Sequence, residues 1–550
     1  MLTTLAMTVL LATTAPPEPP ADLILLSAKI WTGDSKNPEA EALAVRDGRI
    51  VAIGMDSDIS KLKGPKTVVI DGKWRRVVPG FIDCHTHMTG GGFDLLALDV
   101  RHTKDGAEFT SLLAAYAKTR PAEEWLTDGV WDEKWWTPPV LPTRALLDPA
   151  TGDHPTCLSR QDGHMMVCNS LAMKIAGVTA ATPDPPGGVI VRDAKGEPTG
   201  VFKDGAMDLI WEKRPARSAA EMAAALRAAM KHVAKFGVTS VQDLPGGEAD
   251  VPAWAALRDA GAMTVRVNYR PSLGDWPKAK ELQSSIKNDD WFRIGGVKGF
   301  MDGSLGSGTA VMFEDFRDEP GNKGVYAAGA IPLSKIEERI AGADKAGLQV
   351  EVHAIGDRAN AELLDIYERV EKQNGPRDRR FRIEHAQHLR AADIPRFAEL
   401  GVIASMQPYH AVDDGRWAEK RLGADRARTT YAFRTLLDDK ATLAFGSDWD
   451  VAPISPILGI AAAVTRRTID GKNPNGWVPS QKITVEEALR AYTVSAAYAG
   501  FEEKEKGSLE TGKLGDFVIL AADPLRAKLE DLEKIEVDNT VVGGKVVYSR

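Results

Sequence analysis

Eight short apolar segments alternate with amphipathic helical patterns along most of the chain, and this alternation limits the fold more than any other feature of the sequence. Met222, Leu226 and Met230 form one apolar helical face, because residues three and four positions apart share a side of a helix. Strands that alternate with helices are typical of a parallel sheet covered on both faces. Eight such units favour a closed barrel over an open sheet, so we predict an α/β fold, a (β/α)8 TIM-like barrel. The strand candidates are residues 80–87, 238–244, 264–269, 294–301, 348–353, 381–385, 402–407 and 442–447.

The two ends of the chain have a different, β-rich pattern. Asp47-Gly48 lies between apolar stretches, which is a hairpin signal, and the last residues repeat this texture around Gly543-Gly544. We therefore expect strands from both ends to pair into one small composite β-sandwich. The predicted parts are residues 22–78 and 501–550 for the sandwich and residues 79–500 for the barrel.

The first two barrel strands are separated by far more chain than a βα loop requires, which predicts an inserted subdomain at about residues 105–215. Because the insert follows a barrel strand, we expect it over the mouth where barrel enzymes have their active sites. Trp131, Trp135 and Trp136 lie within it. They either line a lid or form the insert's own core, and the sequence leaves both interpretations open.

The first 21 residues resemble a secretory signal and linker: the apolar run Leu2–Ala15 is followed by a proline-rich stretch, although no basic residue precedes it. We expect export to the periplasm or the outside of the cell, with the cytoplasm as the alternative. The only cysteines, Cys84, Cys157 and Cys168, exclude a disulfide framework and leave room for one bridge.

Composition narrows the range of partners. The formal charge of −8 and the lack of a basic block argue against nucleic acid. After the first twenty residues no segment is long and apolar enough to predict a membrane span. A small molecule is therefore the expected partner, and a homo-oligomer stays open.

The clearest chemical signal is a pair of histidines at the end of the first strand candidate. His85 and His87 are two positions apart, so they point to one face of a strand and can bind one metal ion. His353 ends the fifth candidate, His385 ends the sixth, and Asp448 follows the eighth. The carboxyl ends of barrel strands converge on one mouth, so these residues predict a metal centre there.

The sequence resembles the amidohydrolase superfamily, and within it the branch of the N-substituted formamide deformylases, amidohydrolase family 3. The resemblance covers nearly the whole chain, and a composite sandwich around a barrel agrees with it. The motifs that carry it are residues 78–87, 129–133, 162–164, 169–170, 297–307, 353–357, 382–385 and 407–408.

This resemblance implies a set of metal ligands. It assigns His85, His87 and Asp448 to a more buried ion, and His353 and His385 to a more exposed one. Two Zn²⁺ ions are expected, and Mn, Fe or Ni would fit the same ligands.

Lys298 matches a position that two-metal members use as an N-carboxylated lysine. A carbamate formed there from carbon dioxide would bridge the two ions and offset their mutual repulsion. The alternative is an unmodified Lys298 that pairs with Asp302 beside a single metal.

The implied activity is hydrolysis of a non-peptide C–N bond, in a linear amide or an N-acyl or N-formyl amine, by a metal-activated hydroxide. Asp448 would act as the base and pass the proton to the leaving nitrogen. His164 and His410 are catalytic candidates that stabilise the oxyanion or bind substrate, or else they are hydrogen-bonded scaffold. Glu384 is expected to support His385. The alternatives are a single-metal deaminase or a cyclic-amide or ester hydrolase; a catalytically silent binding protein is the weakest.

Overall fold

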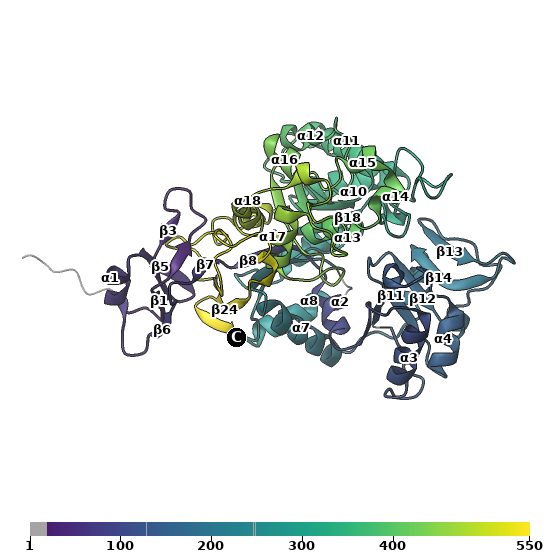
Figure 1. Cartoon of the computed structure of the whole chain (residues 1–550), viewed down its shortest axis with the longest axis horizontal. Helices are drawn as coiled ribbons and strands as arrows, with labels where there is room; N and C mark the ends of the chain where they lie inside the picture. The colour runs from purple at the N-terminus through teal and green to yellow at the C-terminus, as the bar shows by residue number, and fades with distance from the viewer. Residues whose placement is uncertain (1–18, 128, 246, 248) are drawn as a thin grey trace, which may run out of the picture.

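The computed structural model describes residues 19–127, 129–245, 247 and 249–550, and Figure 1 shows three regions in a row along its long axis. β-Strands from the two chain ends occupy one end, the alternating helices and strands the middle, and the insert the other end (Figure 1). The predicted signal-like segment, residues 1–21, lies outside the described residues apart from its last three.

The middle region contains two parallel sheets. In each, every strand runs parallel to its neighbours. The first sheet has the order β17-β16-β15-β8, and the second runs from β18 to β22 in chain order. The first comprises β8 (Phe81–Thr86), β15 (Val238–Asp243), β16 (Arg266–Tyr269) and β17 (Phe292–Ile294). The second comprises β18 (Gly296–Phe300), β19 (Gln349–Ala354), β20 (Arg382–His385), β21 (Ile403–Met406) and β22 (Leu443–Phe445).

Single parallel bridges connect the two sheets at both edges. Ser272, after β16, pairs with Lys298 in β18, and Thr86 in β8 pairs with Trp449, after β22. All the strands therefore end on the same side of the region. This α/β alternation is the fold class that the sequence predicted.

The fourth predicted strand, residues 294–301, is two strands in the structure. β17 ends at Ile294 and pairs with β16, whereas β18 begins at Gly296 and pairs with β19. The chain between them passes very close to its neighbour, because a Cβ at Gly295 would lie 1.7 Å from Asn268 Oδ1. The continuous apolar run in the sequence conceals this break.

Helices cover the outer side of the parallel strands. α7 (Ala219–Ala234) begins with a capping box between Ser218 and Glu221 and buries the apolar face that the sequence predicted. α11 (Asp357–Asn374) buries a similar face that includes Leu363 and Tyr367. The other principal helices are α2 (Met88–Asp94), α8 (Asp250–Asp259), α10 (Leu333–Lys345), α13 (Pro408–Asp414), α17 (Pro456–Thr465) and α18 (Val485–Ala491).

Strands from the two chain ends share one six-stranded sheet, in which β7 pairs with β23. A four-stranded sheet from the N-terminal part packs against it, and Leu25, Ile30, Phe517 and Val541 lie in their common apolar core. The six-stranded sheet comprises β25 (Lys545–Ser549), β24 (Val537–Val542), β23 (Phe517–Leu520), β7 (Arg76–Pro79), β2 (Lys29–Trp31) and β3 (Glu39–Ala40). The four-stranded sheet comprises β5 (Arg49–Gly54), β4 (Ala42–Arg46), β1 (Leu23–Leu26) and β6 (Val68–Asp71).

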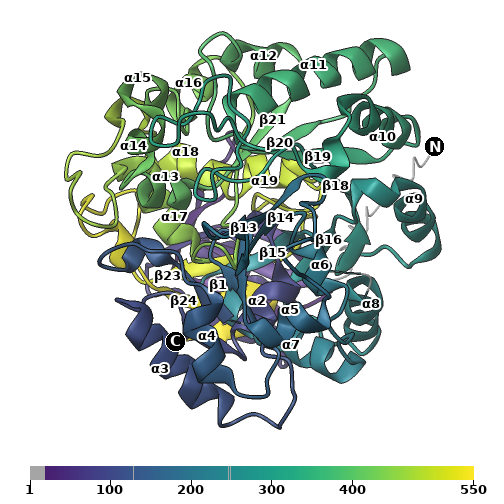
Figure 2. The same ribbon diagram turned by 90° about the vertical axis from the view of Figure 1, so that its right-hand side faces the viewer.

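The insert between β8 and β15 has a sheet and an apolar core of its own. Its strands lie in front of the parallel strands in Figure 2, which views the molecule from the insert's end. The sheet begins at Leu98, earlier than the predicted insert boundary, and one disulfide joins Cys157 to Cys168, while Cys84 is buried and unpaired. The strands, in spatial order, are β13 (Gly188–Arg192), β14 (Pro198–Asp204), β12 (Met165–Cys168), β11 (Cys157–Arg160), β10 (Gly129–Trp131) and β9 (Leu98–Val100).

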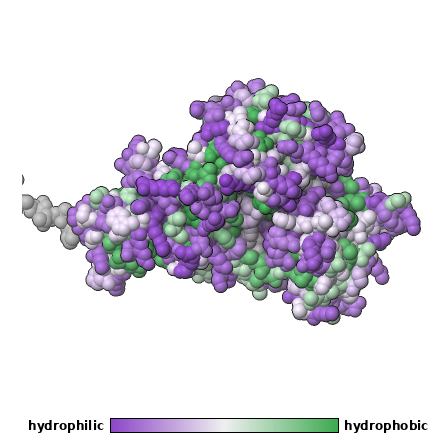
Figure 3. Space-filling model, viewed as in Figure 1, coloured by the Kyte–Doolittle hydropathy of each residue, from purple (hydrophilic) through white to green (hydrophobic). Residues whose placement is uncertain are grey.

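Hydrophilic residues cover most of the face seen in Figure 3, with smaller apolar areas between them. Among the described residues, no helix combines the length and the apolar character needed to cross a membrane.

Candidate metal centre

Every residue that the sequence predicts as a ligand or catalytic group lines one cavity of about 350 Å³. The cavity lies at the carboxyl ends of the parallel strands, and the insert forms part of its wall. The residues concerned are His85, His87, His164, Lys298, His353, His385, His410 and Asp448.

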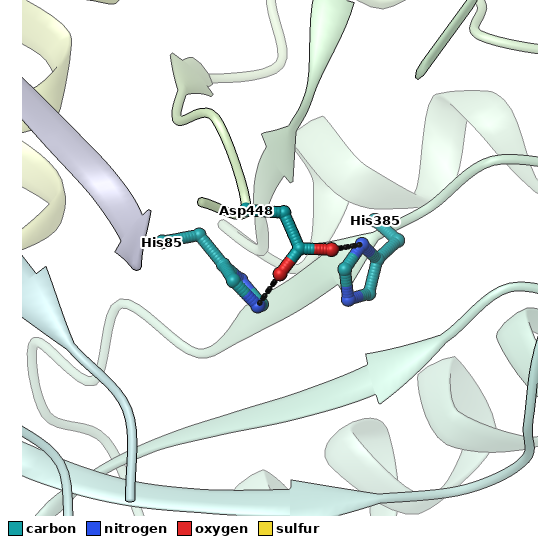
Figure 4. Close-up of side chains that lie close together, drawn as sticks. All are labelled: His85, His385 and Asp448. Carbon is teal, nitrogen blue, oxygen red and sulfur yellow. Dashed lines mark ion pairs between the residues drawn. The ribbon is translucent and has the colours of Figure 1, made fainter. Parts of the chain in front are cut away.

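Asp448 is the centre of this arrangement. Its Oδ1 lies 3.2 Å from Nε2 of His85, and its Oδ2 lies 4.0 Å from Nδ1 of His385 (Figure 4). The same Oδ1 also lies 3.2 Å from Nε2 of His87. Ligand atoms of His85, His385 and Asp448 all lie within 4.8 Å of one another, and all three residues are buried. This spacing suits a metal ion.

Two of these residues have an unusual backbone. His385 has a φ of 74° and Asp448 a φ of 61°, in the left-handed region that side chains other than glycine rarely adopt. Such strain concentrates at functional sites, where the surrounding structure holds it in place. Here it directs both side chains from the ends of strands toward the same point in the cavity.

His85 is fixed from behind by a buried carboxylate. Its Nδ1 donates to Glu384 Oε2 at 2.5 Å, which leaves Nε2 facing Asp448. The prediction that Glu384 supports His385 is wrong. Gln407 Oε1 accepts from His385 Nδ1 at 2.8 Å instead, and the Glu384 carboxylate is engaged by His85, Arg382 and Ser405.

His353 stands on the far side of His385, with 4.5 Å between the ring centroids. Its Nε2 lies 3.1 Å from the carbonyl oxygen of Gly303. Burial lowers the pKa of both His353 and His385 well below the usual value. Both imidazoles are therefore neutral at physiological pH, which is the form that binds metals.

Lys298 lies beside this cluster, and its Nζ is 3.5 Å from His85 Nε2. Burial lowers the pKa of Lys298. Asp302 does not serve as its partner, because the Asp302 carboxylate accepts the backbone N–H groups of Val311, Ile355 and Gly356 at 2.8–3.0 Å.

The insert contributes one charged histidine. His164 Nδ1 donates to Asp204 Oδ1 at 2.6 Å, and its ring lies 5.1 Å from that of His353. Burial lowers the pKa of His164, but the hydrogen bond and charge of Asp204 outweigh this effect and raise it to about 9. His164 is therefore a cation that faces the predicted ligands.

His410 approaches from the opposite wall. Its Nε2 lies 3.8 Å from Asp448 Oδ2, its Nδ1 lies 3.3 Å from Gln387 Nε2, and its ring stacks on that of His385 at 6.3 Å. Burial lowers its pKa, so it is a neutral group next to the Asp448 carboxylate.

The tryptophans of the insert belong to its core. Trp131 and Trp136 are buried among apolar residues such as Phe109 and Leu147, and Trp135 packs against that cluster. The insert instead presents polar side chains to the cavity. These are Asp132, Lys134, Arg160, Gln161, Asp162 and His164.

Sequence reasoning did not single out Asp204 and Gln387, the partners of His164 and His410. Asp204 lies 40 positions after His164 in another strand of the insert, and no local motif links the two. Gln407 belongs to a motif that carried the family resemblance, and its place at the end of a strand could have revealed its contact with His385.

The family model described as the amidohydrolase family matches residues 68–548. The chain belongs to the amidohydrolase family. It is a hydrolytic enzyme, and the alternative of a catalytically silent binding protein is wrong. The predicted resemblance to amidohydrolase family 3 is confirmed.

Similar proteins match along almost their whole length. Protein LONG AFTER FAR-RED 3 of Arabidopsis thaliana is 39% identical and aligns with 96% of this chain and 92% of its own. N-substituted formamide deformylase of Arthrobacter pascens is 27% identical, with 96% and 98% covered. The crystal structure of an uncharacterized metal-dependent hydrolase from Pyrococcus furiosus is 29% identical, with a TM-score of 0.72 over 92% of this chain and 100% of that one.

Proposed function

We propose that this amidohydrolase is a metal-dependent enzyme that cleaves a non-peptide C–N bond, in a linear amide or an N-acyl or N-formyl amine. The observation that carries the proposal is the convergence of Asp448 and neutral imidazoles in one cavity, opposite the charged His164. The chain's similarity to a formamide deformylase and to a metal-dependent hydrolase supports it.

A (β/α)8 barrel is the framework that we assign to this site. The bridges between Ser272 and Lys298 and between Thr86 and Trp449 support closure of the two parallel sheets into one barrel. The division into a sandwich from both chain ends (residues 22–78 and 501–550) and a barrel (79–500) that carries the insert belongs to the same proposal. We also propose export to the periplasm or the outside of the cell, on the basis of the signal-like residues 1–21.

The residues fit two divalent cations. His85, His87 and Asp448 would hold one ion, and His353 and His385 the other. Zinc suits such ligands, and manganese, iron or nickel also fit. The neutral amine that burial favours at Lys298 would be able to react with carbon dioxide, and the resulting carbamate would offer a negatively charged ligand beside the histidines.

A bound divalent metal lowers the pKa of water and polarises a carbonyl group. Asp448 accepts a proton from the attacking water, which adds to the carbonyl carbon. The C–N bond then breaks while Asp448 returns the proton to the leaving nitrogen. His164 donates a hydrogen bond to the developing oxyanion, and its positive charge stabilises that oxygen.

The compact group of His85, His385 and Asp448 favours a second candidate, a single-metal deaminase or a hydrolase of cyclic amides or esters. One ion would fill this group without help from Lys298. The number of metals per chain therefore separates the two candidates.

Lys298→Ala tests the first candidate. The wild-type protein should contain two metals per chain and hydrolyse N-formyl, N-acetyl or N-acyl aromatic amines. The variant should lose activity and much of its metal, and high concentrations of acetate or propionate should restore part of the rate, because a small carboxylate can occupy the bridging position.

Lys506→Ala is the matched control. Lys506 is buried, as Lys298 is, but it pairs with Glu502 at 2.9 Å and does not line the cavity. It should keep both metals. A fully active wild-type protein with one metal and an unmodified Lys298 would overturn the two-metal proposal.

A further inference from the structure

A second cavity of about 400 Å³ adjoins the metal centre. His164, Lys298 and Phe300 line both cavities, so these side chains form the boundary between them. Phe300 keeps 37% of its surface exposed although it is large and apolar. Its ring lies 5.4 Å from that of His353 and 4.6 Å from Lys298 Nζ. The second cavity is therefore directly next to the predicted metal ligands, on the side of Phe300.

Apolar groups from four elements line this second cavity. They are Leu273 after β16, Met207 in the insert, Ala327 and Ala328 in the segment between β18 and α10, and Ile336 in α10. Charged groups also line this cavity. Asp204 Oδ1 accepts from His164, Asp302 accepts from backbone N–H groups, and Arg339 donates to the carbonyl oxygen of Gly329. Asp204 Oδ2 has no hydrogen-bond partner among the described residues, and Asp208 completes the polar part of the lining. An alkyl or aryl group suits the apolar part of this lining.

The position of Asp448 decides which half of a substrate enters. Asp448 lines the first cavity with His87 and His410, and none of these three is among the residues that line the second. The nitrogen must lie near Asp448 to receive its proton, so the amine half occupies the first cavity. The acyl half then points the other way, past Phe300.

We propose that the second cavity is the binding site for the acyl group of the substrate and that it selects apolar acyl chains of several carbons or an aromatic acyl group. This inference rests on the proposed hydrolysis of N-acyl amines. Hydrolysis forms a carboxylate from the acyl half and an ammonium from the amine half, with water supplying the oxygen and the protons. N-formyl amines, which leave the second cavity empty, should be poorer substrates.

The test compares acyl groups on one amine, from formyl and acetyl to hexanoyl and benzoyl. In the wild-type enzyme, kcat/KM should rise with chain length by about fourfold for each buried methylene. Ala328→Trp and Met207→Trp each enlarge a side chain of the lining, and each should lower the ratio of kcat/KM for hexanoyl over acetyl by about tenfold or more. A ratio is insensitive to the fraction of correctly folded enzyme.

Ala260→Trp provides the control, because Ala260 is an exposed residue after α8 and lines neither cavity. It should leave the ratio at the wild-type value. The inference is overturned if the ratio stays constant in both cavity variants, or if rates depend on the amine and not on the acyl group. No hydrolysis of any N-acyl amine by metal-loaded wild-type enzyme would instead refute the proposed function, and the inference with it.

Discussion

Replacing Glu384 by glutamine tests whether a buried carboxylate orients the first predicted ligand. Glu384 Oε2 accepts from His85 Nδ1 at 2.5 Å and from Ser405 Oγ at 2.8 Å, and Oε1 accepts from Arg382 Nε at 2.8 Å. Glutamine has a similar shape but no charge, and its NH₂ group can only donate. The variant therefore removes the negative charge that faces His85 Nδ1, with little change in side-chain volume.

The magnitude follows from the pKa of Glu384. Burial by itself raises this pKa, but the charge of Arg382 and the hydrogen bond from His85 outweigh it and hold the pKa at about 2. A carboxyl whose pKa falls on folding stabilises the protein above its unfolded value of 4.5, and this contribution is lost as pH falls through about 2. A shift of this size corresponds to about 3 kcal/mol of stability at neutral pH. Changing the partner of a ligating histidine lowers metal affinity by about 10- to 100-fold.

Glu502→Gln separates the two effects. Glu502 is also buried, and despite its burial, Lys506 and Arg293 hold its pKa at about 2. Urea unfolding of metal-free protein at pH 7 should show a similar loss of stability in both variants. Competition with a chelator should show weaker metal binding in Glu384→Gln alone. Equal metal affinity in the two variants would refute the role assigned to Glu384.

Two further predictions concern the histidines. His87→Ala should abolish turnover and lower the metal content while leaving the circular dichroism spectrum unchanged, because His87 lies at the cavity and not in an apolar core; full activity would contradict its assignment. The raised pKa of His164 means that its charge is present below about pH 9 and lost above it, so kcat/KM should fall above that pH. Asp204→Asn should move this decline to lower pH, and an unmoved profile would exclude His164 as the group responsible.

The sequence was sufficient for the parts of the site that depend on strand ends. His85, His353, His385 and Asp448 each lie at or near the carboxyl end of a strand. Parallel strands bring these ends to one side, so a list of strands already groups the four residues. The alternation of apolar segments likewise predicted the order of helices and strands. These features are recorded in the local pattern of apolar and polar residues.

Other features depend on packing that no local pattern records. Glu384 contacts His85 across 299 positions of sequence, and only the closeness of β8 and β20 decides between His85 and His385 as its partner. The role of Trp136 was open for a similar reason. An apolar side chain fits a lid or a core equally well, and the fold of the insert around Phe109 places it in the core.

The interior of the proposed barrel connects stability to the site. Barrel interiors are usually filled with branched apolar residues, but here Arg382 is fully buried between Glu351 at 3.0 Å and Glu384 at 2.8 Å. An intact buried ion pair of this kind adds little compared with apolar packing in its place, although removing one partner alone is costly because the other charge is left uncompensated. Arg382 also donates to the carbonyl oxygen of Cys84, next to His85. The network holds both the carboxylate behind His85 and the strand that carries His85, so its charges serve the position of the ligand more than the stability of the fold.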